Sequence, residues 1–241
     1  MVLMSAIVLV RHGQAGFGQD DYDVLSELGV KQSVTLGQHW ARTQAAPELV
    51  FVGPRRRHLL TAEGMQSGAE QSGQSWPQPQ LLAGFDEFAF GDILQAARPQ
   101  LATEFARLSE QLGGADPLRN RRTFEPLFQQ SMQLWITGQL AAPVRESFAD
   151  FVTRVHADLT QVMTSLGRSK SAIIVTSAGP IAAALQLALQ LPNLSVLKVC
   201  TVLANTSLAE LRFRVPEPSS LTALGFNATP HLTDPALLTY R

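Results

Sequence analysis

The chain has 241 residues, a length that fits one α/β domain better than two separate domains. Its 45% hydrophobic and 16% charged residues are typical of a globular protein and exclude a disordered or coiled-coil chain. Lys and Arg total 19 and Asp and Glu total 20, so the net charge is -1. No overall charge therefore attracts nucleic acid or an anionic membrane, and any anion site must be local.

The apolar N-terminus and the single cysteine bear on where the protein works. Residues 1–10 have no basic residues before them and are shorter than the ~20 residues that span a membrane. We therefore expect neither a signal peptide nor a membrane anchor. Cys200 alone cannot form a disulfide within the chain, which fits the reducing cytoplasm.

The first third of the chain alternates between strand and helix patterns. Residues 6–10 are a continuous apolar run that predicts a strand buried on both faces. After it we expect a helix over 26–42 with Ser26 as N-cap, a strand over 49–52, a helix over 55–66 and a polar surface loop over 67–80.

The middle of the chain has helical periodicity. Residues 93–140 carry apolar side chains at helical spacing, which predicts a helical insertion at about 93–142. Ser147 and Asp150 form a capping-box pattern at the start of the clearest helix, which Gly167 closes.

The last third returns to alternation. Strands are predicted over 172–176, 199–204 and 208–213, a helix over 180–191, and a Pro-containing tail after the last strand. The whole pattern predicts one α/β domain over residues 1–241, with three α/β/α layers and a mostly parallel central sheet. A ligand site is expected outside the carboxyl ends of the strands.

Arg11 and His12 stand at the end of the first predicted strand, where such a site would form. Arginine offers a planar fork for phosphate oxygens, and a neutral imidazole can use one ring nitrogen as a nucleophile. An Arg-His-Gly tripeptide by itself is most often an ordinary turn, so the pair needs support from other segments.

Other segments supply that support. Leu9-Val-Arg-His-Gly-Gln-Ala15 resembles the opening motif of the histidine phosphatase superfamily, which has the phosphoglycerate mutase-like fold. Gly53-Pro-Arg-Arg-Arg-His-Leu-Leu-Thr-Ala62 is similar to its Ser-Pro-x-x-Arg-Ala-x-x-Thr-Ala helix, and Phe85-Asp-Glu-Phe-Ala-Phe-Gly91 to its Glu-x-x-x-Gly loop. Further similar segments are 25–29, 145–147, 205–207 and 226–232, so the resemblance spans nearly the whole chain.

The resemblance assigns roles to individual residues. It implies that His12 is the nucleophile that takes the phosphoryl group, that Arg11 and Arg57 bind its oxygens, and that Glu87 donates the proton. Asp86, next to Glu87, could compete for the proton-donor role. No metal and no cofactor is implied.

One family residue is absent. The second histidine of the family follows a strand in a Val-Ser-His-Gly pattern, but Ser177 stands at that position here. A hydroxyl gives a weaker hydrogen bond than an imidazolium, so activity would be reduced. His58 is expected to point about 100° away from Arg57 and not to replace the missing group. His39 is expected at the surface, His156 in a half-buried structural role, and His231 in a local packing or loop-fixing role.

The sequence therefore predicts a cytoplasmic phosphomonoesterase that uses a phosphohistidine at His12. A mutase is disfavoured because the mutase signatures are absent. The alternative is a weak or inactive protein of the same fold that binds a phosphorylated ligand. The Arg119–Arg122 cluster is read as a solvated turn rather than a substrate contact. The partner is a phosphorylated substrate, not nucleic acid or membrane, and neither its identity nor the oligomeric state follows from the sequence.

Overall fold

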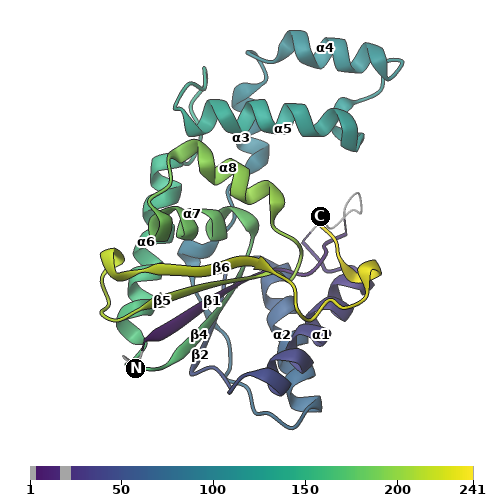
Figure 1. Ribbon diagram of the computed structural model, residues 1–241. Helices are drawn as coiled ribbons and strands as arrows, with labels where there is room; N and C mark the ends of the chain where they lie inside the picture. The colour runs from purple at the N-terminus through teal and green to yellow at the C-terminus, as the bar shows by residue number, and fades with distance from the viewer. Residues whose placement is uncertain (1–3, 17–22, 241) are drawn as a thin grey trace.

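The computed structural model describes residues 4–16 and 23–240 (Figure 1). Its strands are β1 (Ser5–Arg11), β2 (Leu49–Val52), β3 (Gln80–Leu81), β4 (Ser171–Thr176), β5 (Leu208–Phe213) and β6 (Thr222–Ala228). Its helices are α1 (Glu27–Thr43), α2 (Arg56–Gln71), α3 (Phe90–Ala97), α4 (Ala102–Gln111), α5 (Arg121–Ile136), α6 (Phe148–Ser165), α7 (Ala178–Leu189) and α8 (Asn193–Val202).

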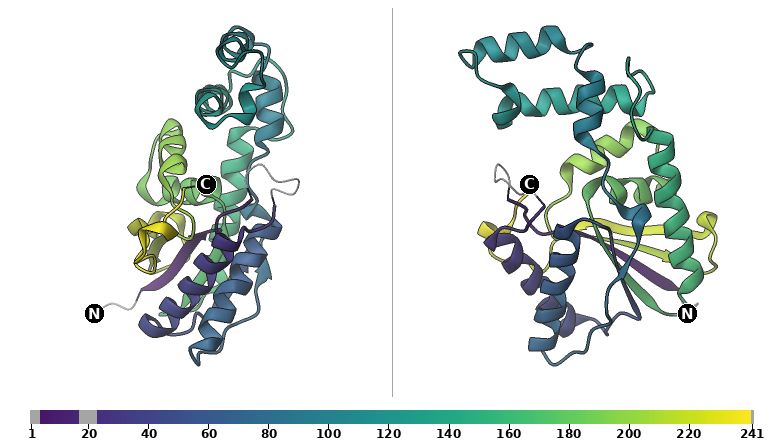
Figure 2. Two further views of the ribbon diagram at one scale, coloured as in Figure 1. Left: turned by 90° about the vertical axis from the view of Figure 1, so that its right-hand side faces the viewer. Right: turned by 180° about the vertical axis from the view of Figure 1, so that it is seen from behind.

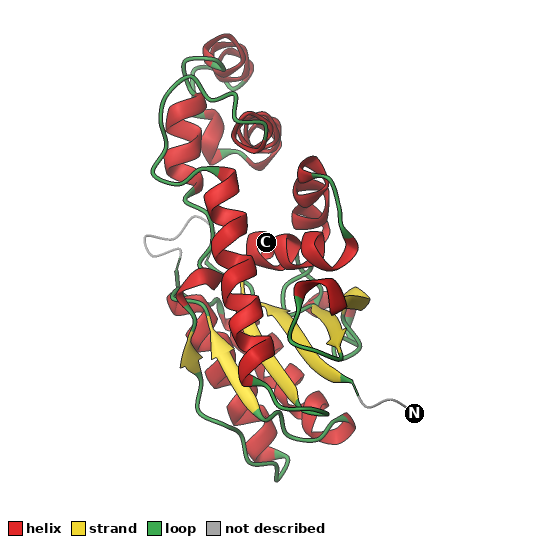
Figure 3. Ribbon diagram, turned by 90° about the vertical axis from the view of Figure 1, so that its left-hand side faces the viewer, coloured by secondary structure: helices red, strands yellow, loops and turns green. Residues whose placement is uncertain are grey.

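The six strands form one sheet in the order β3-β2-β4-β1-β5-β6. The pairs β1–β4, β2–β4 and β2–β3 are parallel, whereas β5 runs antiparallel to both β1 and β6. Helices lie on both sides of the sheet (Figure 3). The predicted three-layer α/β/α fold with a mostly parallel sheet is confirmed.

Alternate residues of the central strands supply two separate cores. Ile7 and Leu9 of β1 belong to the cluster that includes α6 and α7, whereas Val8 and Val10 belong to the cluster that includes α1 and α2. This follows from the twofold period of a strand, which sends successive side chains to opposite faces. Burial on both faces thus explains the continuous apolar run of β1. The two cores hold this strand in place, and with it the start of the loop that follows it.

The two helix caps that the sequence predicts, at Ser26 and Ser147, are present in the structure. The Ser26 hydroxyl accepts a hydrogen bond from the Gly29 N–H at the start of α1. At the start of α6, Ser147 and Asp150 form both hydrogen bonds of a capping box. Such caps satisfy N–H groups that have no partner within the helix.

Three sequence expectations are wrong. Residues 199–202, expected in a strand, lie in α8, because packing of this helix on α7 and α5 overrides the β preference of Val199, Thr201 and Val202. The tail contains a further strand, β6, whose side chains are largely exposed and therefore show no strong apolar signal. Residues 67–71, expected in a loop, are the last turn of α2.

Helices α3, α4 and α5 lie beyond the sheet, in the region where a helical insertion was expected (Figure 2). Trp135 and Ile136 of α5 join the core cluster around α6. Across the described residues, no helix combines the length and the apolar character that crossing a membrane requires.

Candidate active site

Four parallel strands end at the same edge of the sheet, and each is followed by residues of the candidate site. β1 ends at Arg11 and leads to His12, and β4 leads to Ser177. β2 leads through Gly53 to Arg55 and Arg57, and β3 leads to Glu87. The sheet therefore brings together residues that are up to 166 positions apart in the chain, from Arg11 to Ser177.

His12 is buried and held in one tautomer. Its Nδ1 lies 2.7 Å from the Gly13 carbonyl oxygen, which can only accept a hydrogen bond. Nδ1 therefore carries the hydrogen, and Nε2 keeps its lone pair. Burial, with Arg57, Arg11 and His58 nearby, holds the pKa of His12 well below its usual value, so the ring is neutral. A neutral imidazole with a free Nε2 lone pair is a nucleophile.

The loop after β5 fixes the backbone of His12. The side-chain amide of Asn205 donates to the His12 carbonyl at 3.1 Å, and the Thr206 N–H donates to the Arg11 carbonyl at 3.0 Å. His231 anchors that loop, because its Nε2 lies 2.9 Å from the Thr206 hydroxyl. This contact confirms that His231 has a loop-fixing role.

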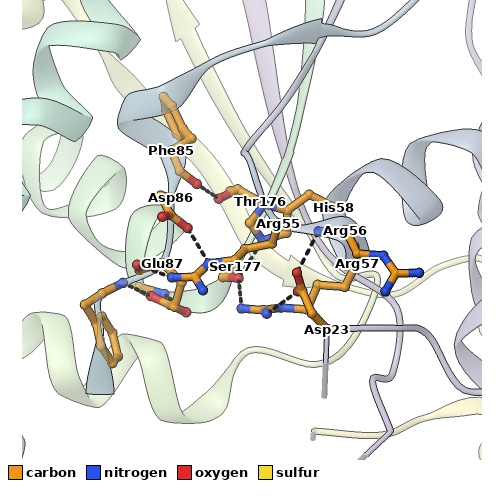
Figure 4. A network of polar contacts seen from close by, with 12 residues as sticks. Asp23, Arg55, Arg56, Arg57, His58, Phe85, Asp86, Glu87, Thr176 and Ser177 are labelled. Carbon is orange, nitrogen blue, oxygen red and sulfur yellow. Dashed lines mark hydrogen bonds and ion pairs between the residues drawn. The ribbon is translucent and has the colours of Figure 1, made fainter. Parts of the chain in front are cut away.

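Arg57 is held at both terminal nitrogens. Nη1 donates to Asp23 at 2.7 Å and Nη2 donates to the Ser177 hydroxyl at 3.1 Å, as the dashed lines in Figure 4 show. The guanidinium is buried. Arg11 is also buried, and its Nη1 donates to the carbonyls of Leu203 and Tyr240. Both guanidinium groups are thus positioned before any ligand arrives.

Glu87 comes from the loop before α3, and its side chain lies beside the N-terminus of α7. Its carboxylate oxygens accept hydrogen bonds from the Phe88 N–H at 3.1 Å and the Gly179 N–H at 3.3 Å. A Cβ on Gly179 would lie 2.1 Å from Glu87 Oε1, so only glycine allows this approach. Burial raises the pKa of Glu87 above its usual value although Arg57 and both N–H groups oppose the shift. A carboxyl that keeps its proton can act as a general acid.

Asp86, the other candidate proton donor, is engaged elsewhere. Its Oδ1 accepts a hydrogen bond from Arg55 Nε at 2.5 Å (Figure 4). Arg55 also donates to the Glu87 carbonyl at 3.3 Å. The Asp86–Arg55 pair therefore braces the loop that carries Glu87.

A cavity of about 420 Å³ lies at this site. Its polar wall includes Arg11, His12, Arg55, Arg57 and Glu87. Its apolar lining includes four phenylalanines from α3, α5 and the loop before α3: Phe88, Phe90, Phe124 and Phe128. Phe90 packs against Phe124 and Phe128 with ring centroids 5.5 and 4.9 Å apart. The cavity lining thus combines cationic and aromatic side chains.

The structure brings four of the five sequence-predicted site residues to this cavity: Arg11, His12, Arg57 and Glu87. Ser177 does not border it. Its side chain is fully buried behind Arg57. Phe128 also borders the cavity, whereas Trp135 of the same helix is buried in the core.

Arg57 borders the cavity and His58 does not, as expected, but the two side chains share one hydrogen-bond partner. His58 Nε2 lies 2.7 Å from the Ser177 hydroxyl, which also bonds Arg57. The 100° between neighbouring helix positions describes where side chains start, and it does not prevent two long side chains from reaching the same atom. A signal was present: the chain has Gly53 and His58 where the similar motif has Ser and Ala, and a Cβ on Gly53 would lie 2.5 Å from His58 Nδ1.

Asp23 and Arg55 were not singled out from the sequence. Arg55 is one of three consecutive arginines and Asp23 one of several nearby aspartates, so only the fold reveals which of them has a partner in the site. His156 is half-buried and bonds the Ala183 carbonyl at 2.9 Å, which confirms its structural role. Arg119 and Arg122 are exposed and lie outside the cavity lining. Among the described residues, no group of three or more His, Cys, Asp or Glu side chains is arranged to hold a metal ion.

A sequence model of the histidine phosphatase superfamily (branch 1) matches residues 7–122 and 93–223.

Solved structures with the same fold have low sequence identity. A variant of phosphoserine phosphatase from Entamoeba histolytica, solved with phosphoserine, is 19% identical with a TM-score of 0.64, covering 95% of this chain and 100% of that one. A mycobacterial glucosyl-3-phosphoglycerate phosphatase is 20% identical with a TM-score of 0.61, covering 94% and 100%. Phosphoglycerate mutase from Bacillus anthracis is 15% identical with a TM-score of 0.60, covering 95% and 96%. At these identities the likeness shows the fold. No curated protein sequence matches the chain.

Proposed function

Because the chain belongs to branch 1 of the histidine phosphatase superfamily, we propose that it hydrolyses phosphomonoesters through a phosphohistidine formed on His12. The observation that carries this proposal is the tautomer of His12, since the Gly13 carbonyl leaves Nε2 free to attack phosphorus. The family and its solved relatives support a phosphatase. The substrates named for those relatives, phosphoserine and glucosyl-3-phosphoglycerate, support a phosphorylated small molecule as the substrate.

The proposed reaction has two displacements at phosphorus. In the first, the Nε2–P bond forms, the bond from phosphorus to the ester oxygen breaks, and Glu87 gives its proton to the departing alcohol. In the second, water attacks phosphorus, Glu87 accepts a proton from that water, and the Nε2–P bond breaks to release inorganic phosphate. Arg11 and Arg57 stabilise the charge on the phosphoryl oxygens in both steps.

The rival proposal is a protein of the same fold that binds a phosphorylated ligand without turning it over. Ser177 motivated this alternative, because a hydroxyl is a weaker donor than an imidazolium. The lowered pKa of His12 and the raised pKa of Glu87 favour the enzyme, since a binding site needs neither shift. Binding that saturates without release of phosphate would support the rival.

The pH dependence of turnover tests the proposal. His12 must be neutral, and its pKa is lowered, so kcat/KM should rise with pH along a limb below about pH 6.5. Glu87 must be protonated, so its raised pKa sets where kcat/KM falls again at higher pH. We expect a bell-shaped profile for an alkyl ester such as glycerol phosphate, whose alcohol needs the proton of Glu87, and Glu87→Gln should remove the falling limb and keep the rising limb. A rising limb above the usual imidazole pKa would contradict the role of His12.

The aromatic part of the cavity lining predicts a substrate with an apolar alcohol portion. Removing Phe124 or Phe128 by substitution with Ala should raise KM for naphthyl phosphate roughly tenfold, as expected for the loss of one buried aromatic contact. KM for glycerol phosphate should stay within about twofold. The control is Phe226→Ala, which removes an exposed phenylalanine of β6. Equal effects on both substrates would show that these rings do not select the alcohol.

A further inference from the structure

His58 is a fully buried imidazole close to the candidate site that the proposed reaction does not use. Its ring centroid lies 5.8 Å from that of His12. Gly53 makes room for it, since a Cβ there would lie 2.5 Å from its Nδ1. Burial, together with Arg57, lowers the pKa of His58 well below its usual value, so the ring is neutral.

His58 is connected to Arg57 through a single hydroxyl. Ser177 Oγ lies 2.7 Å from His58 Nε2 and accepts a hydrogen bond from Arg57 Nη2 at 3.1 Å. A hydroxyl has one hydrogen and two lone pairs, so it can serve both neighbours whichever tautomer His58 adopts. In either tautomer, the oxygen is fixed between the imidazole and the guanidinium. Hydrogen bonds in such a chain also strengthen one another when they are buried.

The contacts of His58 and Ser177 lead to Arg57, a cation that borders the cavity. Asp23 fixes Nη1 of Arg57 and Ser177 fixes Nη2, so the plane of the guanidinium is set from both sides. A planar guanidinium binds two phosphoryl oxygens well only in the right orientation, and a small rotation weakens both bonds. The contact of His58 with Ser177 therefore bears on how Arg57 meets a ligand.

We propose that His58 is a positioning residue of the phosphate site, which acts through the Ser177 hydroxyl to orient Arg57 toward the phosphoryl group. The inference rests on the proposed function in one respect, that Arg57 binds a phosphoryl oxygen. The other buried or half-buried histidines differ. His231 and His156 bond the loop after β5 and the backbone of α7, and neither contacts an arginine that lines the cavity.

Moving the imidazole from position 58 to position 177 tests the inference. In Ser177→His alone, the new ring has no room beside His58, whose Nε2 already lies 2.7 Å from Oγ. The double variant His58→Ala with Ser177→His vacates that space and returns an imidazole to the neighbourhood of Arg57. Relief of that clash alone would also raise the activity of the double variant, so the comparison is His58→Ala with Ser177→Leu, which fills the same space without an imidazole and should not be rescued.

We expect His58→Ala and Ser177→His each to lower kcat/KM for 4-nitrophenyl phosphate by roughly 10- to 100-fold. The double variant should be at least about tenfold more active than either single variant. A double variant whose loss equals the product of the two single losses would overturn the inference, as would full activity in His58→Ala. His156→Gln is the control, a change at an imidazole of α6 outside this chain of contacts, and should leave kcat/KM within about twofold.

Two further measurements cover the other ways in which the experiment could fail. If His58→Ala does not fold, His58→Gln keeps a polar atom for Ser177 and His58→Leu does not. We expect Gln to retain at least about tenfold more activity than Leu, and equal activity would overturn the inference. If the wild-type protein shows no turnover, the proposed function fails, but calorimetry with inorganic phosphate still tests His58. His58→Ala should weaken the Kd roughly tenfold and the double variant should restore it; an unchanged Kd would overturn the inference.

Discussion

His12→Ala lowers phosphomonoesterase activity by at least about a thousandfold, because the proposed reaction has no other nucleophile for phosphorus. Such a loss corresponds to about 4 kcal/mol of transition-state stabilisation. Release of phosphate from 4-nitrophenyl phosphate, measured with purified wild-type and variant proteins, checks the prediction. Thermal unfolding and circular dichroism should show that the fold survives the substitution.

His39→Ala is a matched control for this experiment. It removes a partly buried imidazole of α1 that does not border the cavity, and we expect its activity to stay within about twofold of the wild type. Substantial turnover by a folded His12→Ala protein would show that water attacks the substrate directly or that another residue is the nucleophile.

Glu87→Gln should give the second large effect, and its size should depend on the leaving group. An alkyl alcohol needs a proton as it departs, so the loss of kcat for an alkyl phosphate should be about 100- to 10,000-fold. 4-Nitrophenolate is a stable anion, so the loss for 4-nitrophenyl phosphate should be about tenfold or less. Steady-state kinetics with a series of phosphate esters of graded alcohol pKa provide the measurement.

Asp86→Asn is the comparison for that series. Asp86 forms an ion pair with Arg55 and does not border the cavity. Its substitution should therefore change kcat by a similar factor for every ester. A leaving-group dependence that follows Asp86 and not Glu87 would assign the proton donor to Asp86 instead.

The sequence predicts the central layer of the fold well. β1 and β4 are continuous apolar runs, and a strand buried on both faces leaves little other choice for such residues. The caps of α1 and α6 were also predicted, because Ser26 and Ser147 act on N–H groups a few residues away. Local chemistry and long apolar patterns were therefore sufficient for these elements.

Elements whose form depends on distant contacts were not predicted. α8 carries β-branched residues but becomes a helix because Val196 and Leu197 pack against the core. β6 is an edge strand with exposed side chains, so it lacks the alternation that marks a half-buried strand.

The same limit applies to the candidate site. His12 and Glu87 were assigned from short motifs, and the structure places them at one cavity. The contact of His58 with Ser177 joins residues 119 positions apart, and the pair of Arg57 with Asp23 joins residues 34 apart. No periodicity or spacing encodes such contacts. They depend on where the loops after β1, β2 and β4 meet.

The stereochemical course at phosphorus tests the central proposal most directly. A phosphorothioate ester made chiral with oxygen-18 and hydrolysed in water enriched in oxygen-17 yields a chiral inorganic thiophosphate. Two in-line displacements, first by His12 and then by water, each invert phosphorus, so we predict overall retention of configuration. Overall inversion would mean a single displacement by water and would contradict a phosphohistidine intermediate.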